Sequence, residues 1–133
     1  MEAQKIIVTG GATRIGAAIA ERLSGFKVQI VIQYNMSRAK GELLKKKLEK
    51  KGSKIYLIKA DLRKEKDVKK IVNFAKTKMG YLDCLINNAS VFDNDKIENF
   101  NSKSWNNHLN ANLKAPAILS KEFSKHVMKG NNN

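Results

Sequence analysis

The sequence predicts an α/β protein with a doubly wound parallel sheet, and two features of its 133 residues carry this prediction. Short apolar runs alternate with stretches of helical periodicity along most of the chain. A glycine-rich segment follows the first apolar run directly. Alternating strands and helices with short connections are typical of a parallel sheet, because each return to a parallel strand needs a crossover.

Four apolar runs are predicted to be strands. They are rich in β-branched residues and are bounded by glycine or polar residues. They cover residues 5–10, 27–34, 54–60 and 81–89. The expected strand order is 3-2-1-4. Residues 82–86 of the fourth strand would then have one neighbour and one open side.

Helices are predicted between and after these runs. They cover residues 14–25, 37–52 with Ser37 as N-cap, and 64–80, and a fourth begins near Ser102 or Ser104. The expected inward side chains of the first two helices are Ile15, Ala18, Ile19, Leu23, Leu43, Leu44 and Leu48. We expect one domain over residues 1–133, with a loose tail at 129–133.

Composition argues against several classes of function. The net charge is +14, but only four of the 26 basic residues are arginine, and the lysines are scattered. Proteins that bind nucleic acid favour arginine, so we expect a solvated lysine-rich surface and no nucleic-acid partner.

No apolar run approaches the roughly 18 residues of a membrane span, which predicts a cytoplasmic protein without membrane contact. The single cysteine, Cys84, is expected to be a small buried hydrophobe. His108 and His126 lack metal-like partners, so no metal site is expected.

The segment "TGGATRIG" (residues 9–16) predicts a phosphate-binding loop. It lies between a predicted strand and a predicted helix, at the sheet edge where such folds bind ligands. Gly10 permits a tight turn, and Gly16 lets the helix pack closely on the sheet. The helix N-terminus offers free N–H groups to a diphosphate. The candidate cofactor contacts of this loop are Gly10, Thr13, Arg14 and Ile15.

Two further segments end strands at the same edge. "ADL" (60–62) follows the third strand, and "NNAS" (87–90) follows the fourth. Asp61 could accept a hydrogen bond from an adenine amino group or could cap a helix. Small residues at 88–90 would let a ribose approach the backbone, although asparagines also suit turns. The candidate cofactor contacts here are Asp61, Leu62, Asn88, Ala89 and Ser90.

These motifs resemble those of the short-chain dehydrogenases/reductases. "TGGATRIG" matches the TGxxxGxG loop of that family except at Arg14, and "DL" and "NNAS" match its adenine and NNAG motifs. "NANLKAP" (110–116) is similar to the segment with the family's helix asparagine, here Asn112. The resemblance implies a Rossmann-type, NADP- or NAD-binding domain. It also implies a catalytic role for Asn112, whose carbonyl holds a water in the proton relay of the family.

Pro116 gives that last motif a physical meaning. A helical N–H at residue 116 would normally bind the carbonyl of Asn112, and proline has none. The carbonyl of Asn112 would then be released. An ordinary proline kink is the alternative interpretation.

The end of the second strand favours NADP as the cofactor. An NAD site needs an acidic residue there, and "QYNMSR" (33–38) has none. Asn35 and Ser37 can donate hydrogen bonds to a 2′-phosphate, and Arg38 adds charge. A polar strand end followed by an N-cap is the alternative.

Arginine at position 14 is similar to a subset of the family, the pteridine reductases. There the arginine lies along the cofactor phosphates and reaches the substrate, which implies that Arg14, Ser90 and Phe92 bind a small-molecule, pteridine-like substrate. Phe92 as a core aromatic is the alternative. Met36 departs from the subset, which usually carries a second basic residue there.

The family's catalytic tyrosine motif, YxxxK, does not occur in these residues. The positions four after Tyr34, Tyr56 and Tyr81 hold Arg38, Ala60 and Leu85. We therefore expect a fold truncated after its fourth strand and fourth helix, without the catalytic part and inactive alone. A non-catalytic dinucleotide-binding module, the product of an interrupted gene, and a basic surface protein with relic motifs are the alternatives. A homo-oligomer is expected through apolar residues of the fourth helix, namely Leu109, Leu113, Ile118, Leu119 and Phe123.

Overall fold

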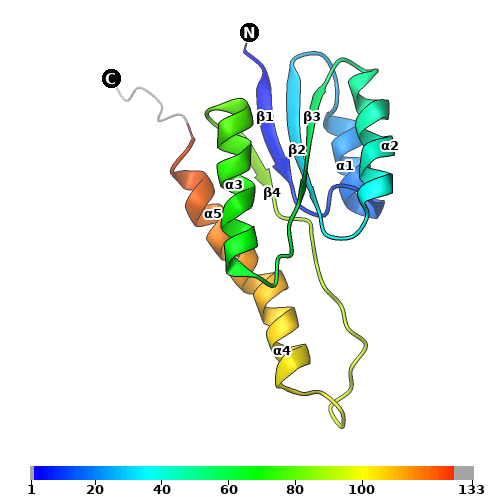
Figure 1. Ribbon diagram of the computed structural model, residues 1–133, viewed down its shortest axis with the longest axis vertical. Coiled ribbons are helices and arrows are strands. Elements are labelled where there is room, and N and C mark those ends of the chain that lie inside the picture. The colour runs from blue at the N-terminus through cyan, green and yellow to red at the C-terminus, as the bar shows by residue number, and fades with distance from the viewer. Residues whose placement is uncertain (1, 128–133) are drawn as a thin grey trace.

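The computed structural model of the chain describes residues 2–127 (Figure 1). The predicted loose tail at 129–133 lies outside the described residues. The sheet contains β1 (Gln4–Val8), β2 (Val28–Tyr34), β3 (Lys54–Lys59) and β4 (Cys84–Ile86). The helices are α1 (Arg14–Leu23), α2 (Arg38–Glu49), α3 (Glu65–Met79), α4 (Ser102–Leu109) and α5 (Ala115–Ser124), with a π-helical turn η1 (Asn110–Lys114) between the last two. Within residues 2–127, no helix is both long and apolar enough to cross a membrane.

The strand order is β3-β2-β1-β4, and every pairing is parallel. This order and the Rossmann-type α/β class confirm the predicted fold. Register pairs Ile7 of β1 with Val31 of β2 and Leu85 of β4. The carboxyl ends of the strands therefore meet at one edge of the sheet, where the loops after β1, β3 and β4 come together.

Alternation along β1 and β2 divides the core between the two faces of the sheet. Ile6 and Ile30 pack with the cluster under α1 and α2, whereas Ile7 and Val31 pack with the cluster under α3 and α5. All four are at most 3% exposed. In Figure 1, α1 and α2 lie on one side of the sheet, while α3 and α5 lie on the other. Helices thus cover both faces, as a parallel sheet requires.

The inward face of α1 differs from the prediction. Gly16 and Ala20 are buried, whereas Ile15 is 69% exposed and Ala18 is also exposed. Gly16, Ala20 and Leu23 share one helical face, and the small residues on it let the helix approach the sheet closely. Apolar residues occur around the whole helix, so periodicity alone selected the wrong face. In α2 the predicted residue Leu43 is likewise exposed, while Leu44 and Leu48 are buried.

The strand β4 is shorter than predicted and is the edge strand of the sheet in the described part of the chain. Cys84 is exposed there, so its prediction as a buried hydrophobe is wrong. Full burial there would need a neighbouring strand on both sides, whereas β4 pairs with no strand other than β1 within residues 2–127. The expected open side is closed at one point, because the Leu82 N–H donates to the carbonyl of His126 at 2.9 Å and Leu82 pairs with Val127 in a parallel bridge.

The long helical segment α4–η1–α5 begins where the sequence predicted it. Asn101 is the N-cap, and its side chain accepts hydrogen bonds from the N–H groups of Lys103 and Ser104. Leu119 is fully buried against α3, so it does not belong to an exposed apolar surface as expected. Leu109 and Leu113 are 39% and 66% exposed. In Figure 1, α4 extends beyond the sheet, which explains why its apolar residues are left uncovered.

Candidate functional site

A pocket of about 260 Å³ lies at the carboxyl edge of the sheet. It is lined by Gly10, Thr13, Arg14, Ile15, Gly16, Gln33, Asn35, Asp61, Leu62, Asn88, Ala89, Ser90, Val91 and Ala111. Ten of the eleven predicted cofactor contacts are among these residues. The exception is Ser37, which is the N-cap residue of α2 but makes no capping hydrogen bond with its side chain.

The glycine loop is built by close approach of backbone to backbone. Gly10 has a φ of +60°, which glycine adopts without strain. A Cβ placed on Gly16 would lie 2.1 Å from the Gly10 carbonyl oxygen and 2.6 Å from Nδ2 of Asn88. No side chain fits there. The start of α1 is thereby held directly against the loop.

Thr9 and Asn88 fasten the glycine loop to the loop after β4. The buried Thr9 hydroxyl oxygen accepts hydrogen bonds from the N–H groups of Asn88 and Ala89, both at 3.1 Å. The Asn88 side chain donates back to the carbonyls of Thr9 at 3.0 Å and Gly10 at 3.3 Å. Asparagine at 88 is therefore more than a turn residue, because it fixes two walls of the pocket to each other.

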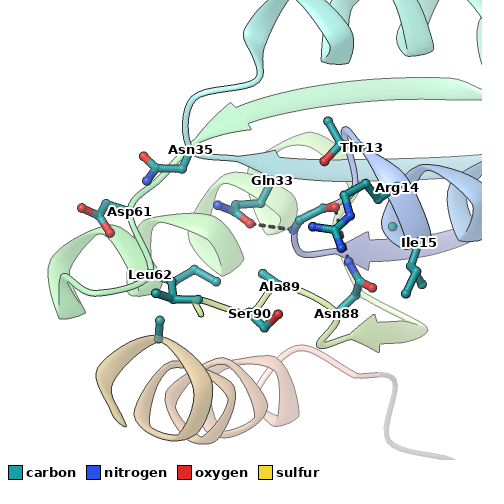
Figure 2. Close-up of a pocket in the computed structure, with 14 residues that line it drawn as sticks. Thr13, Arg14, Ile15, Gln33, Asn35, Asp61, Leu62, Asn88, Ala89 and Ser90 are labelled. Carbon is teal, nitrogen blue, oxygen red and sulfur yellow. Dashed lines mark hydrogen bonds between the residues drawn. The ribbon is translucent and has the colours of Figure 1, made fainter. Parts of the chain in front are cut away.

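Gln33 is a functional candidate that the sequence analysis missed. It is only 2% exposed, and its amide oxygen accepts a hydrogen bond from the Gly10 N–H at 2.8 Å (Figure 2). Its amide nitrogen donates to the Ala60 carbonyl at 2.7 Å. One side chain thus joins the ends of β1, β2 and β3. The available signal was a polar residue at the carboxyl end of the apolar strand "VQIVIQY", next to the glycine loop.

Arg14 has a φ of +52°, in the left-handed region that disfavours side chains. Residues with a Cβ lose roughly 1–2 kcal/mol there. The family motif has glycine at this position, which tolerates the conformation. In Figure 2, Arg14 lies with Ile15 and Asn88 at one end of the pocket, while Asn35 and Asp61 lie at the other. The guanidinium is therefore placed at the end opposite Asp61.

Asp61 is held by bonds to both its backbone and its carboxylate. Its N–H donates to the Asp67 carboxylate at 2.8 Å. Arg63 donates from its backbone N–H and its Nε to Oδ1, at 3.0 and 2.9 Å, and from Nη2 to Oδ2 at 2.9 Å. The hydrogen bond from the Arg63 side chain lowers the pKa of Asp61 below its ordinary value. Asp61 does not cap α3, whose N-cap is Lys64.

Asn112 makes contacts that the sequence did not predict. Its side-chain oxygen accepts a hydrogen bond from the Val91 N–H at 2.7 Å, and its amide donates to the Val91 carbonyl at 2.8 Å. Asn112 lies in η1, where the Ala115 N–H bonds the Asn110 carbonyl five residues earlier. This π-helical turn ends just before Pro116. Such turns within α-helices are frequent at functional sites. The side chain fixes the pocket wall at Val91.

Phe92 lies outside the pocket lining, contrary to expectation. It is 85% exposed, so it is not a core aromatic either. Its ring packs edge-on against His108, with centroids 6.4 Å apart. Nε2 of His108 accepts a hydrogen bond from the Asp93 N–H at 2.9 Å, which ties this loop to α4. Ser90, two residues earlier in the chain, does line the pocket.

Known proteins are similar to this chain in both sequence and fold. The sequence profile of the family described as short chain dehydrogenase matches residues 4–133. A short-chain dehydrogenase/reductase named FrzI, from Cladobotryum sp, is 31% identical over 121 residues, which are 91% of this chain and 47% of that protein. The chain spans about half the length of the curated relatives it matches.

Two solved structures illustrate the likeness in three dimensions. A short chain dehydrogenase from Burkholderia cenocepacia J2315, in complex with NADP, has a TM-score of 0.91 at 29% identity, over 97% of this chain and 53% of that one. The FolM alternative dihydrofolate reductase 1 from Brucella canis, complexed with NADP, has a TM-score of 0.85 at 34% identity, over 94% and 50%. With a family profile matched along nearly its whole length, the chain belongs to the short-chain dehydrogenase family.

Proposed function

We propose that this chain forms the NADP-binding portion of a short-chain oxidoreductase that transfers hydride to a small carbonyl or pteridine-like substrate. The observation that carries the proposal is the pocket at the carboxyl edge of the sheet, where ten residues chosen from sequence motifs meet. The cofactor supplies the hydride when bound. The chain's own residues bind and orient it.

The Asp61 end of the pocket suits an adenine ring. Asp61 offers a carboxylate acceptor. Within the described residues, the Leu62 N–H next to it has no hydrogen-bond partner. An acceptor beside a donor complements the amino group and N1 of adenine. We assign both residues to adenine binding on this pattern.

The end of β2 suits a 2′-phosphate rather than a free 2′-hydroxyl. Asn35 lines the pocket there, and residues 33–38 contain no acid. Ser37 follows with a hydroxyl that caps no helix, and the exposed Arg38 adds positive charge. The two similar solved structures described above contain NADP. Together these features favour NADP over NAD.

The opposite end of the pocket suits a substrate with polar heteroatoms. Arg14 lies at that end, Ser90 also lines the pocket, and a guanidinium can bridge a phosphate and a heterocycle. The likeness to the FolM alternative dihydrofolate reductase supports a pteridine. A direct test adds dihydrofolate to the NADPH complex. We expect binding that depends on Arg14, and binding equal in the Arg14→Gly variant would contradict the pteridine assignment.

Arg14→Gly should weaken NADPH binding by roughly tenfold or more, because one charge-assisted hydrogen bond is lost. The fold should stay intact and gain a little stability, because glycine relieves the strained φ of +52°. Fluorescence titration of NADPH and thermal unfolding measure the two effects.

Lys27→Gly is the matched control for this prediction. Lys27 also has a positive φ, of +62°, but it does not line the pocket. Its replacement should raise the unfolding temperature in the same way and leave NADPH binding unchanged. Loss of the folded state in Arg14→Gly would show that the arginine is structural, and unchanged binding would remove it from the site.

Hydride transfer in this family needs a tyrosine and lysine that are not among these residues. We propose that the Asn112 segment, with its bonds to Val91, orders the substrate side of the pocket for that pair. The coding sequence downstream of codon 133 tests the enzymatic proposal. A continuing frame with YxxxK supports it, and a stop codon there favours a non-catalytic dinucleotide-binding module.

We also propose that the chain self-associates through the helical segment 102–124. Trp105, Leu109 and Leu113 are exposed there, at 56%, 39% and 66%. Exposed apolar side chains grouped on one element commonly mark an interface. Light scattering over a concentration series should give a mass above 14.9 kDa that rises with concentration. A constant mass of 14.9 kDa with a cooperative thermal transition would contradict this proposal.

A further inference from the structure

Arg63 stands beside the candidate adenine pocket without lining it. Its side chain is 42% exposed, whereas the Asp61 side chain with which it forms a salt bridge is 13% exposed. Arg63 is absent from the residues around the pocket, and Asp61 is among them. The guanidinium therefore approaches the carboxylate from outside and leaves the pocket side to a ligand.

The hydrogen bonds to Asp61 leave little acceptor capacity. A carboxylate has about four lone-pair positions. Oδ1 accepts two hydrogen bonds, from the backbone N–H and Nε of Arg63, and Oδ2 accepts one from Nη2. One position on Oδ2 remains. A bidentate guanidinium also fixes the plane of the carboxylate, which a single donor cannot do.

We propose that Arg63 is a specificity-determining residue, which positions the last free acceptor of Asp61 so that the pocket prefers a 6-aminopurine over a 6-oxopurine. This inference rests on the proposed function. A 6-amino group donates to the fixed acceptor, and N1 of the same ring accepts from the Leu62 N–H. A 6-oxopurine presents an oxygen to the carboxylate and an N1–H to the Leu62 N–H, so both contacts become repulsive.

The backbone around Asp61 does not depend on Arg63's side chain. The Asp61 N–H is held by Asp67, and the Asp61 carbonyl accepts from the Lys64 N–H at 3.0 Å. Removal of the guanidinium therefore loosens only the carboxylate, which keeps the single hydrogen bond from the backbone N–H of residue 63. A carboxylate held by one donor can turn away from a 6-oxo group, which makes the wrong base tolerable.

The test compares NADPH with its hypoxanthine analogue, in which the 6-amino group is replaced by oxygen. We expect the unmodified chain to prefer NADPH by at least about tenfold, as one hydrogen bond to a charged group would give. Arg63→Ala should reduce this ratio to a few-fold, mainly by tighter binding of the analogue. Asp61→Asn should also lower the ratio, because an amide can present either a donor or an acceptor, and the preference that remains comes from the Leu62 N–H.

Arg22→Ala is the matched control, since Arg22 is an exposed arginine in the last turn of α1. Arg22→Ala should prefer NADPH over the analogue by the same factor as the unmodified chain. If Arg63→Ala does not fold, Arg63→Lys is the variant to test, because lysine keeps the charge but cannot make the bidentate hydrogen bonds. The preference of Arg63→Lys for NADPH over the analogue should also fall.

Two results would overturn the inference while leaving the cofactor site in place. One is NADPH binding without any preference for the adenine form. The other is a ratio that stays unchanged in Arg63→Ala or Arg63→Lys, even if both ligands bind more weakly, since that is the signature of a merely structural role. If the unmodified chain binds neither dinucleotide, the proposed function itself fails, and this inference with it.

Discussion

Gly16→Ala should abolish NADPH binding and destabilise the fold by about 3 kcal/mol or more. The added Cβ would lie 2.1 Å from the Gly10 carbonyl oxygen and 2.8 Å from its carbonyl carbon. These are backbone atoms, which cannot rotate away as a flexible side chain can. Either α1 shifts outward or the glycine loop moves, and overpacking of this severity exceeds the usual cost of about 1–3 kcal/mol. Chemical denaturation and NADPH titration measure the two effects.

Gly41→Ala is the control that separates this clash from a general effect of alanine. Gly41 is also buried in a helix, but a Cβ there would meet Ala12 and Leu57 at 3.6 Å, an ordinary contact distance. Alanine should stabilise α2 by about 0.5–1 kcal/mol through its higher helix propensity. Equal stability of the two variants would contradict the close packing of α1 on the glycine loop.

Gln33→Leu should destabilise the chain by about 2–4 kcal/mol and weaken NADPH binding. Leucine has a similar volume, but it leaves both the Gly10 N–H and the Ala60 carbonyl without their partner. Each buried polar group left unpaired costs about 1–3 kcal/mol. Gly10 also lines the pocket, so the loop that we propose to bind the phosphates loses the hydrogen bond that holds it in place.

Gln29→Leu serves as the comparison within the same strand. Gln29 is half-buried, and its side chain makes one hydrogen bond within residues 2–127, which it accepts from the Tyr56 hydroxyl at a long 3.4 Å. Gln29→Leu should change the free energy of unfolding by less than about 1 kcal/mol. A similar loss of stability in Gln29→Leu and Gln33→Leu would mean that the hydrogen bonds of Gln33, which connect β1, β2 and β3, do not contribute to stability.

The arrangement of strands and helices was predictable because periodicity and glycine positions agree along the chain. The order β3-β2-β1-β4 is the Rossmann order, which was expected from the glycine loop at residues 9–16. The inward face of α1 was not predictable. Its buried residues are Gly16 and Ala20, which carry little hydrophobic signal, while Ile15 points outward. This face points inward because α1 packs very close to the glycine loop, and a hydrophobic pattern does not show how closely two segments approach.

The pocket residues were predictable where a short motif ends a strand, as at Asp61 and Asn88. The contacts that shape the pocket were not. Gln33 and Arg63 act through hydrogen bonds whose partners depend on how neighbouring segments meet. Phe92 was expected in the pocket because it belongs to the same segment as Ser90. The backbone after Ser90 instead directs the Phe92 ring to the surface. Side-chain direction after a strand is set by the loop, and the loop at 91–101 has no periodicity to read.

The central claim is that the pocket binds NADP, and isothermal titration of the 133-residue chain with NADPH and with NADH tests it most directly. Binding should be measurable with NADPH and clearly weaker with NADH, because residues 33–38 offer donors and positive charge to a 2′-phosphate and no acid to a 2′-hydroxyl. The ratio of the two dissociation constants carries the result. Equal affinities, or a preference for NADH, would contradict the assignment of NADP to this site.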